Sequence, residues 1–270
     1  MLWGAIIGDI VGSVYEFSNI RTKNFQLMTD RNHITDDSCM TVAVANALLH
    51  ATIRKSDVQD ATIRSMRLIG RRFPDMGYGF GFRHWLESAV PEPYNSWGNG
   101  SAMRVSAVGW VGQDLNQVKH LSYMVTSVTH NHIEGIKGAE ATSVAVFLAR
   151  TGHSKEAIAN YIHENYYPSC PSVDELRDTY DWDVSCQGTV PQALQCFFES
   201  TSFEDTLRNA ISIGGDSDTI GAIAGAVAGA YYGVPQQLQD MARSYVPSEL
   251  LALVDKFHNW MSNKDTSIGE

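Results

Sequence analysis

GGDSDTIGAIAGAVAG, residues 214–229, joins an acidic cluster directly to a run of small and apolar residues. The paired glycines at its start indicate a tight turn, and the run that follows is typical of a helix. Glycine recurs in it every fourth residue, at Gly221, Gly225 and Gly229. Each helical glycine costs about 1 kcal/mol relative to alanine. Close packing against the backbone of another helix would offset this cost.

The first apolar segment of the chain carries the same spacing, at Gly4, Gly8 and Gly12. We therefore expect two central helices that pack unusually tightly on neighbouring backbone, close to the acidic residues. Chance enrichment in small residues is the alternative explanation. The distance from each glycine row to the nearest helix backbone distinguishes the two explanations.

Helical periodicity covers nearly the whole chain, and alternating patterns of strand length are absent. The sequence therefore predicts an all-α protein with one compact domain over residues 1–262 and a frayed tail over 263–270. The predicted helices are 2–17, 36–53, 57–72, 81–89, 101–111, 115–127, 133–150, 155–165, 190–199, 203–211, 219–232 and 249–261. The predicted longer loops are 18–35, 73–80, 91–100 and 164–189.

The composition limits the class of protein. Of the 270 residues, 44% are hydrophobic, which suffices for a sizeable buried core. The net charge of -10 argues against nonspecific binding of nucleic acid, whose phosphates require clustered basic residues. A small anionic substrate needs only a local basic or N–H-rich patch, so the net charge does not exclude this class of ligand.

Four scattered cysteines without a CxxC pair favour a reducing cytoplasm over a disulfide framework. The apolar start of the chain has no basic region and carries Asp9, so it differs from a signal peptide. No stretch approaches the roughly 20 apolar residues that span a bilayer. We therefore expect a cytoplasmic protein that does not enter a membrane, and we favour a monomer.

Two acidic clusters far apart in the chain carry the strongest functional signal. Thr35-Asp36-Asp37 and Asp216-Ser217-Asp218-Thr219 each precede a helical run and pair two carboxylates with a hydroxyl. Such hard oxygen ligands suit Mg²⁺ or Mn²⁺ rather than Zn²⁺. Either cluster alone is also explained as a helix N-cap. If the fold brings them together, four carboxylates at one point need cations, and the clusters form a two-metal site.

Two further carboxylates, Asp9 and Glu16, lie in the first helical segment. We expect Glu16 at the end of this helix, where the helix dipole disfavours a negative charge. A role as metal ligand or general base therefore explains Glu16 better than a structural role. Asp9 lies in the middle of the apolar run and is better explained by a buried structural hydrogen bond or by support of the metal ligands.

A glycine-rich loop, Ser96-Trp97-Gly98-Asn99-Gly100-Ser101, leads through Ala102-Met103-Arg104 into a predicted helix. Backbone N–H groups at a helix start bind phosphate, and glycines permit close approach. Gly-Asn-Gly alone is also an ordinary turn. We expect Arg104 either to bind phosphate or to pair with an acidic residue.

Four other side chains leave alternatives open. We expect His130 either near the substrate and the metal ligands or in a structural role. For His132 the structural role is favoured, because no further ligand completes a zinc set. Tyr180 and Trp182 lie in a polar loop, where they either stack on a base or pack on the protein.

Taken together, these motifs resemble the ADP-ribosylglycohydrolase family, which includes the dinitrogenase reductase-activating glycohydrolase. The similarity extends over about residues 1–235. It lies in GDxxGxxYE at 8–16, TDDSxMT at 35–41, GNGxAMR at 98–104, Thr129-His130 and GDSDTIG at 215–221. One departure is Ser38, where the family often has threonine.

The resemblance implies an orthogonal helical domain with a central dinuclear metal cleft that holds two divalent cations, Mg²⁺ or Mn²⁺. It implies catalytic roles for Glu16, as the acid/base residue, and for Asp37 and Asp216. The implied metal ligands are Thr35, Asp36, Asp37, Asp216, Asp218 and Thr219. The implied contacts to the diphosphate, ribose and neighbouring parts of the substrate are Ser96, Trp97, Gly98, Asn99, Gly100, Ser101, Met103 and His130.

The resemblance further implies hydrolysis of an ADP-ribosylated protein or a small ADP-ribose conjugate, with release of ADP-ribose and reversal of mono-ADP-ribosylation. The alternatives are another metal-dependent nucleotide hydrolase and a non-catalytic ADP-ribose-binding or regulatory protein. Release of intact ADP-ribose distinguishes them. The acceptor stays open among arginine, serine, a nucleic-acid base and an O-acetyl group.

Overall fold

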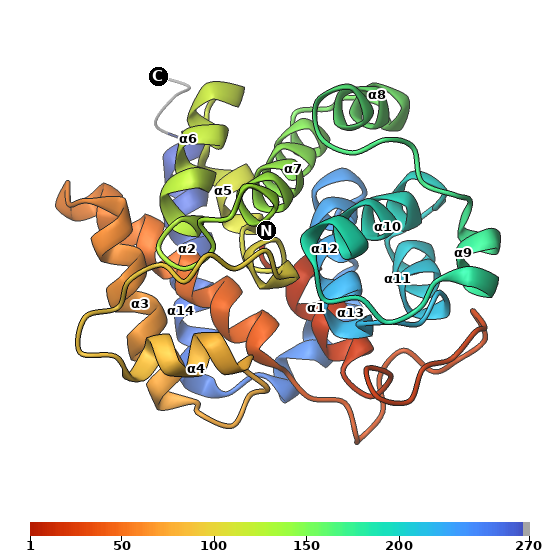
Figure 1. Ribbon diagram of the computed structural model, residues 1–270, viewed down its shortest axis with the longest axis horizontal. Coiled ribbons are helices and arrows are strands. Elements are labelled where there is room, and N and C mark those ends of the chain that lie inside the picture. The colour runs from red at the N-terminus through yellow and green to blue at the C-terminus, as the bar shows by residue number, and fades with distance from the viewer. Residues whose placement is uncertain (267–270) are drawn as a thin grey trace.

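Two glycine-striped helices pack against each other at the centre of the protein. The computed structural model describes residues 1–266, and in it α1 (Trp3–Gly12) contacts α12 (Ser217–Tyr231) along its length (Figure 1). Both helices are almost completely buried. Their neighbours enclose them, since α2 (Asp36–Arg54) contacts α1, and α7 (Ile133–Arg150) and α10 (Cys186–Phe198) contact α12.

The backbones of the central pair approach so closely that only glycine fits. A Cβ atom at Gly8 would lie 1.9 Å from the carbonyl oxygen of Gly221. A Cβ atom at Gly225 would lie 2.4 Å from the carbonyl oxygen of Gly4. No side chain can occupy such a gap. The prediction of two tightly packed central helices is therefore confirmed, and chance enrichment does not explain the glycines.

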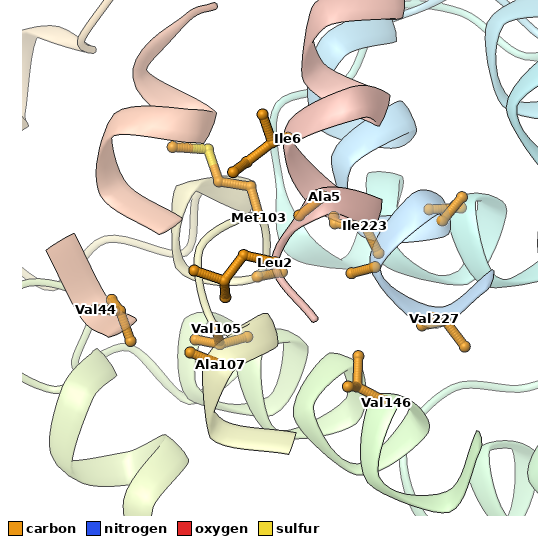
Figure 2. Packing of buried hydrophobic residues seen from close by; sticks show 14 of the residues in the cluster. Leu2, Ala5, Ile6, Val44, Met103, Val105, Ala107, Val146, Ile223 and Val227 are labelled. Carbon is orange, nitrogen blue, oxygen red and sulfur yellow. The ribbon is translucent and has the colours of Figure 1, made fainter. Parts of the chain in front are cut away.

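The remaining helices surround this pair. Figure 1 shows α2 to α4 on one side of it and α9 to α11 on the other. Figure 2 shows Leu2, just before α1, and Ile6 of α1 in the hydrophobic core, together with Val227 of α12 and Val146 of α7. The other elements are α3 (Val58–Arg72), α4 (Phe80–Glu87), η1 (Asn99–Ser101), α5 (Ser106–Val111), α6 (Leu115–Thr126), α8 (Lys155–Asn165), α9 (Val173–Thr179), α11 (Phe203–Ser212), α13 (Gln236–Ala242), η2 (Arg243–Tyr245) and α14 (Ser248–Thr266).

The all-α prediction is confirmed. Over residues 1–266 the only β feature is an isolated bridge between Gly98 and Ser185. In this part of the chain, no helix combines the length and the apolar character that crossing a bilayer requires. Residues 263–266 of the predicted tail belong to α14, and its remainder, 267–270, lies outside the described residues.

Several predicted helix boundaries were wrong, and two of them lie close to the acidic residues and the glycine-rich loop. The first helix ends at Gly12 rather than at residue 17, because side chains from outside the helix occupy the carbonyl of Ile10. Asn32 Nδ2 donates to this carbonyl at 2.6 Å and Ser13 Oγ at 2.8 Å. The helix predicted from residue 101 begins only at Ser106, since residues 99–101 form the 3₁₀ turn η1 instead.

Part of the predicted loop 164–189 is helical. It contains α9, whose start carries a reciprocal capping box between Ser172 and Glu175, and the first turn of α10, which Ser185 caps. The sequence prediction also missed α13. Because α9 and α13 have only seven residues each, neither shows a clear hydrophobic period.

Candidate active site

The fold brings the two acidic clusters together. Asp37 lies in the first turn of α2, and Asp218 and Thr219 lie in the first turn of α12. Because both helices pack against α1, their N-terminal ends meet, and Thr219 Oγ1 lies 3.3 Å from Asp37 Oδ2. Carboxylate oxygens of Glu16, Asp216 and Asp218 lie within 4.8 Å of one another. Acidic side chains from three separate parts of the chain therefore converge.

Asp9 fixes the N-terminal end of α2. Its Oδ2 accepts hydrogen bonds from the backbone N–H groups of Thr35 and Ser38, each at 3.0 Å, and its Oδ1 accepts from the hydroxyl of Thr35 at 2.8 Å. The hydroxyl of Ser38 also donates to Asp9. Thr35 in turn caps α2 by accepting from the N–H of Asp37 at 3.2 Å. These bonds support the structural explanation of Asp9 and show that Thr35 is a helix cap.

Capping does not explain the second cluster. Asp216 occupies the N-cap position of α12, yet its side chain makes no capping hydrogen bond. Its Oδ2 instead accepts from Asn99 Nδ2 at 2.7 Å. Asp37 Oδ1 is buried and has no hydrogen-bond partner among the described residues. A buried carboxylate oxygen without a donor is costly unless a cation meets it, so this oxygen-only set fits Mg²⁺ or Mn²⁺.

Burial and mutual repulsion favour the protonated form of these carboxyl groups. Burial, reinforced by neighbouring carboxylates, raises the pKa of Asp36, Asp37 and Asp218 well above the usual range. The same two causes raise the pKa of Glu16 to about 8. Burial raises the pKa of Asp216 to about 6. Divalent cations would offset this repulsion and keep the cluster ionised at neutral pH.

Glu16 lies in a bend after α1 and not at a helix C-terminus, so the helix-dipole argument for its role does not apply. Asn19 holds this bend. Its Nδ2 donates to the carbonyls of Glu16 at 3.1 Å and Gly215 at 2.9 Å, and its Oδ1 accepts from the N–H of Gly215 at 2.8 Å. Asn19 thereby places Glu16 beside the turn that carries Asp216. The sequence analysis missed Asn19, because one asparagine in a polar loop has no periodicity or spacing that identifies it.

A cavity of about 330 Å³ opens from the acidic cluster. Trp97 and Ser101 do not line it. Trp97 is 52% exposed, with its ring 5.4 Å from that of His132, and Ser101 is buried and donates to the carbonyl of Gly135 at 2.8 Å. The other residues expected at the substrate do line the cavity, namely Ser96, Gly98, Asn99, Gly100, Met103 and His130.

Asn99 connects the glycine-rich loop to the acidic cluster. Its backbone N–H donates to the carbonyl of Val184 at 2.8 Å, which pins the loop to the segment before α10. Its side-chain Nδ2 donates to Thr189 Oγ1 at 3.1 Å as well as to Asp216. The side chain of Asn99 therefore links the loop that a ligand would contact to the carboxylate of Asp216.

Arg104 supports His130 rather than pairing with a carboxylate. It is buried, and its Nη2 donates to Thr129 Oγ1 at 2.6 Å and lies 3.4 Å from His130 Nδ1. Burial, together with the Arg104 charge, lowers the pKa of His130 well below its usual range, so the ring is neutral. Because a guanidinium only donates, Nδ1 accepts from it and the ring proton is on Nε2. Nε2 lies 3.7 and 3.6 Å from the positions that Cβ atoms at Gly98 and Gly100 would take, so it faces the glycine-rich loop.

The two aromatic residues of the polar loop have different environments. Tyr180 packs on the protein, since its hydroxyl donates to the carbonyl of Gly188 at 2.7 Å and its ring covers Gly215. Trp182 lines the cavity and stacks on Phe17, with ring centroids 5.6 Å apart. Of the two, only Trp182 has a position from which it can contact a ligand in this cavity.

Comparisons with known proteins agree on one family. Residues 1–266 match the family model described as ADP-ribosylglycohydrolase. The chain is 27% identical to the ADP-ribosylhydrolase ARH3 of Mus musculus, over 93% of this chain and 88% of that protein. It is 26% identical to the ADP-ribosylarginine hydrolase Tri1 of Pseudomonas putida, over 86% of this chain and 70% of that protein. A solved structure, an ADP-ribosylglycohydrolase-related protein complex, has the same fold, with a TM-score of 0.69, 21% identity and coverage of 95% and 94%.

Proposed function

Because the chain belongs to the ADP-ribosylglycohydrolase family, we propose that it is a metal-dependent enzyme that releases ADP-ribose from mono-ADP-ribosylated conjugates. Membership makes it a glycosidase-type hydrolase. The observation that carries the proposal is the meeting of both acidic clusters with Glu16 at one end of a cavity that the glycine-rich loop lines. An ADP-ribose group has matching chemistry, with ribose hydroxyls at its end and a diphosphate next to them.

The proposed site holds two divalent cations, Mg²⁺ or Mn²⁺, between the N-terminal ends of α2 and α12. When bound, such ions anchor ribose hydroxyls and lower the pKa of water. The orphaned Oδ1 of Asp37 and the uncapped carboxylate of Asp216 support this assignment. The proposed ligands are Thr35, Asp36, Asp37, Asp216, Asp218 and Thr219.

The protein side chains then have distinct tasks. Glu16 takes a proton from the attacking water, and burial, reinforced by the neighbouring carboxylates, raises its pKa to about 8 when no cation is bound. The negative cluster stabilises the positive charge that develops on the ribose as the glycosidic bond lengthens. The loop at residues 96–100 faces the diphosphate, and neutral His130 donates from Nε2 beside it.

A product assay tests the proposal directly. An ADP-ribosylated peptide is incubated with the protein in Mg²⁺, in Mn²⁺ and after treatment with EDTA, and the products are separated by mass. We expect intact ADP-ribose and the unmodified peptide only when a cation is present. Full activity in EDTA would exclude the metal mechanism, and AMP as the product would favour a nucleotide hydrolase that cuts the diphosphate.

We expect Glu16→Gln to slow hydrolysis by about 10²- to 10⁴-fold, the usual contribution of a general acid–base group. The amide keeps the shape of the side chain but cannot take a proton. Calorimetric titration with Mn²⁺ and with ADP-ribose should show binding close to that of the unmodified protein. An unchanged rate of hydrolysis would remove Glu16 from the chemistry.

Stability of the cation-free protein should fall as the pH rises. Glu16 has a folded-state pKa of about 8, above its value of 4.5 in the unfolded chain, so the folded state binds the extra proton between these limits. Its contribution to stability is full at low pH and is lost as the pH rises through this window. Thermal unfolding at pH 5 and pH 8 should show a Tm several degrees lower at pH 8, and Mg²⁺ should raise Tm more at pH 8. A Tm that does not depend on pH would contradict this.

A further inference from the structure

A second cavity, of about 250 Å³, lies between α2 and α3, which pack side by side (Figure 1). None of the residues that line it lines the cavity beside the acidic cluster. Its polar lining is Asn46, His50, Arg54, Ser56, Arg64 and Ser65. The proposed function gives this cavity no role.

The cavity lies in a basic part of an acidic protein. Residues 54–72 contain six lysines and arginines against two aspartates, whereas the whole chain has a net charge of -10. Of the described residues that line the cavity, none is acidic. Burial lowers the pKa of His50, and the charges that lower it further are both cations, Lys256 and Arg54. The electrostatic potential at this cavity is therefore positive.

Both arginines of the lining can bind a ligand. Arg54 makes no hydrogen bond or ion pair with any of the described residues. Arg64 Nη1 lies 4.0 Å from Asp60 Oδ2, and both of these side chains are mostly exposed. Such an ion pair contributes little to stability because water screens it. An anion in the cavity would therefore meet two guanidinium groups whose charges the protein leaves largely unneutralised.

Two buried polar side chains add a hydrogen-bond donor. Asn46 is 9% exposed and Ser65 is 4% exposed, and Asn46 Nδ2 donates to Ser65 Oγ at 3.0 Å. Ser65 is the acceptor in this bond, and its own hydroxyl proton has no acceptor among the described residues. The hydroxyl of Ser56 makes no hydrogen bond in that part of the chain either. Because a buried donor without an acceptor is costly, a ligand with acceptor oxygens would stabilise this arrangement.

We propose that the cavity between α2 and α3 binds the phosphate group of a small phosphate monoester. This site is separate from the proposed catalytic centre. A phosphate ester is close to a dianion at neutral pH and offers three strong acceptor oxygens. Two guanidinium groups match its charge and its geometry, since arginine donates to phosphate oxygens in parallel pairs. The hydroxyls of Ser56 and Ser65 supply further donors for the same oxygens.

The apolar part of the lining fits the organic part of such an ester. Ala47 and Ala61 belong to a small hydrophobic cluster between α2 and α3. Leu68 also lines the cavity, and it is 68% exposed. A carbon chain that extends from the phosphate over these side chains would bury apolar surface, which inorganic phosphate does not. An ester should therefore bind more tightly than inorganic phosphate.

The test is a titration of the full chain with glycerol 3-phosphate, followed through the backbone amide signals in NMR spectra. Mg²⁺ and saturating ADP-ribose are present throughout, and sodium chloride keeps the ionic strength constant. The variants are Arg54→Gln and Arg64→Gln. The matched control is Arg83→Gln, which removes an exposed arginine of α4 that lines neither cavity. Because all three side chains are exposed, thermal unfolding should show the same Tm for every variant.

We expect saturable shifts of the amide signals of Ser56 and Ser65, and none at Gly98 and Gly100 of the first cavity. Arg54→Gln and Arg64→Gln should each weaken binding by about tenfold, the effect of one hydrogen bond to a charged group. Arg83→Gln should weaken it by less than about twofold, since a distant exposed charge is screened. Inorganic phosphate should shift the same signals with a larger Kd.

Three results would overturn the inference. One is the absence of saturable shifts at Ser56 and Ser65. Another is an equal loss of affinity in Arg83→Gln and Arg64→Gln, which would show attraction to the overall charge of this face and no defined site. The third is tighter binding of inorganic phosphate than of glycerol 3-phosphate. None of these results bears on the release of ADP-ribose, because the two cavities share no residue.

Discussion

Asp218→Ala is expected to abolish turnover, with a loss of at least about 10³-fold in kcat. Asp218 is buried at the first turn of α12, and its carboxylate lies within 4.8 Å of those of Glu16 and Asp216. Asp218 is proposed to bind the cation and to stabilise the positive charge of the transition state. Removing it therefore raises the activation free energy by several kcal/mol, and each 1.36 kcal/mol lowers the rate tenfold. Release of ADP-ribose at saturating Mn²⁺ measures the effect.

The same variant should be folded and, without cations, more stable than the unmodified protein. Asp218 repels the other carboxylates of the cluster, and burial makes its charge costly. Alanine removes that cost. Thermal unfolding in EDTA should therefore show a higher Tm for Asp218→Ala, while titration with Mn²⁺ shows weaker binding. Full turnover, or unaltered cation binding, would contradict the assignment of Asp218, and Asp178→Ala serves as a control that alters neither.

Gly8→Ala is expected to prevent folding or to lower stability by more than about 3 kcal/mol, beyond the usual range for a point change. The new Cβ would lie 1.9 Å from the carbonyl oxygen of Gly221 and 2.8 Å from the backbone nitrogen of Ala222. Both are main-chain atoms, so no side chain can move aside and the helices must separate. Denaturant unfolding of the soluble protein measures the decrease in the free energy of unfolding. Expression of the variant only as aggregates would show that it does not fold.

A second glycine provides the matched control for stability. A Cβ atom at Gly79 would meet nothing within 4 Å, and its φ of -60° suits any residue. Gly79→Ala should leave the free energy of unfolding almost unchanged. If Gly8→Ala were tolerated as well as Gly79→Ala, close packing would not explain the glycine rows.

The sequence was sufficient to predict the centre of this fold because the signal there is repeated. Glycine every fourth residue in two helices has one physical explanation, close backbone approach, and Gly8 and Gly221 meet accordingly. The two acidic clusters were predictable for a related reason, since each offers more oxygens than one helix cap uses. Thr35 acts as a cap, whereas Asp216 does not.

Features that depend on a distant partner were not predictable. The end of α1 is set by Asn32, whose amide donates to Ile10 from a loop that local periodicity does not describe. The bend around Glu16 is likewise set by Asn19 and its contacts with Gly215. The amide of Asn99 was expected at the substrate, yet its hydrogen bonds go to Asp216 and Thr189. In each case the tertiary fold determines the hydrogen-bond partners of an amide side chain, and the local sequence does not indicate them.

The pairing of α1 with α12 also determines when the protein can fold. α1 is buried along its whole length in the folded protein, yet its main partner follows about 210 residues later in the chain, roughly 10–40 s at ordinary rates of synthesis. Until then only part of its surface can be covered, by α2, and closing so long a loop is slow. Nascent chains therefore pass through a prolonged interval in which the apolar side chains of α1 are incompletely covered. A chain that stops before α12 forms neither the core nor the catalytic centre.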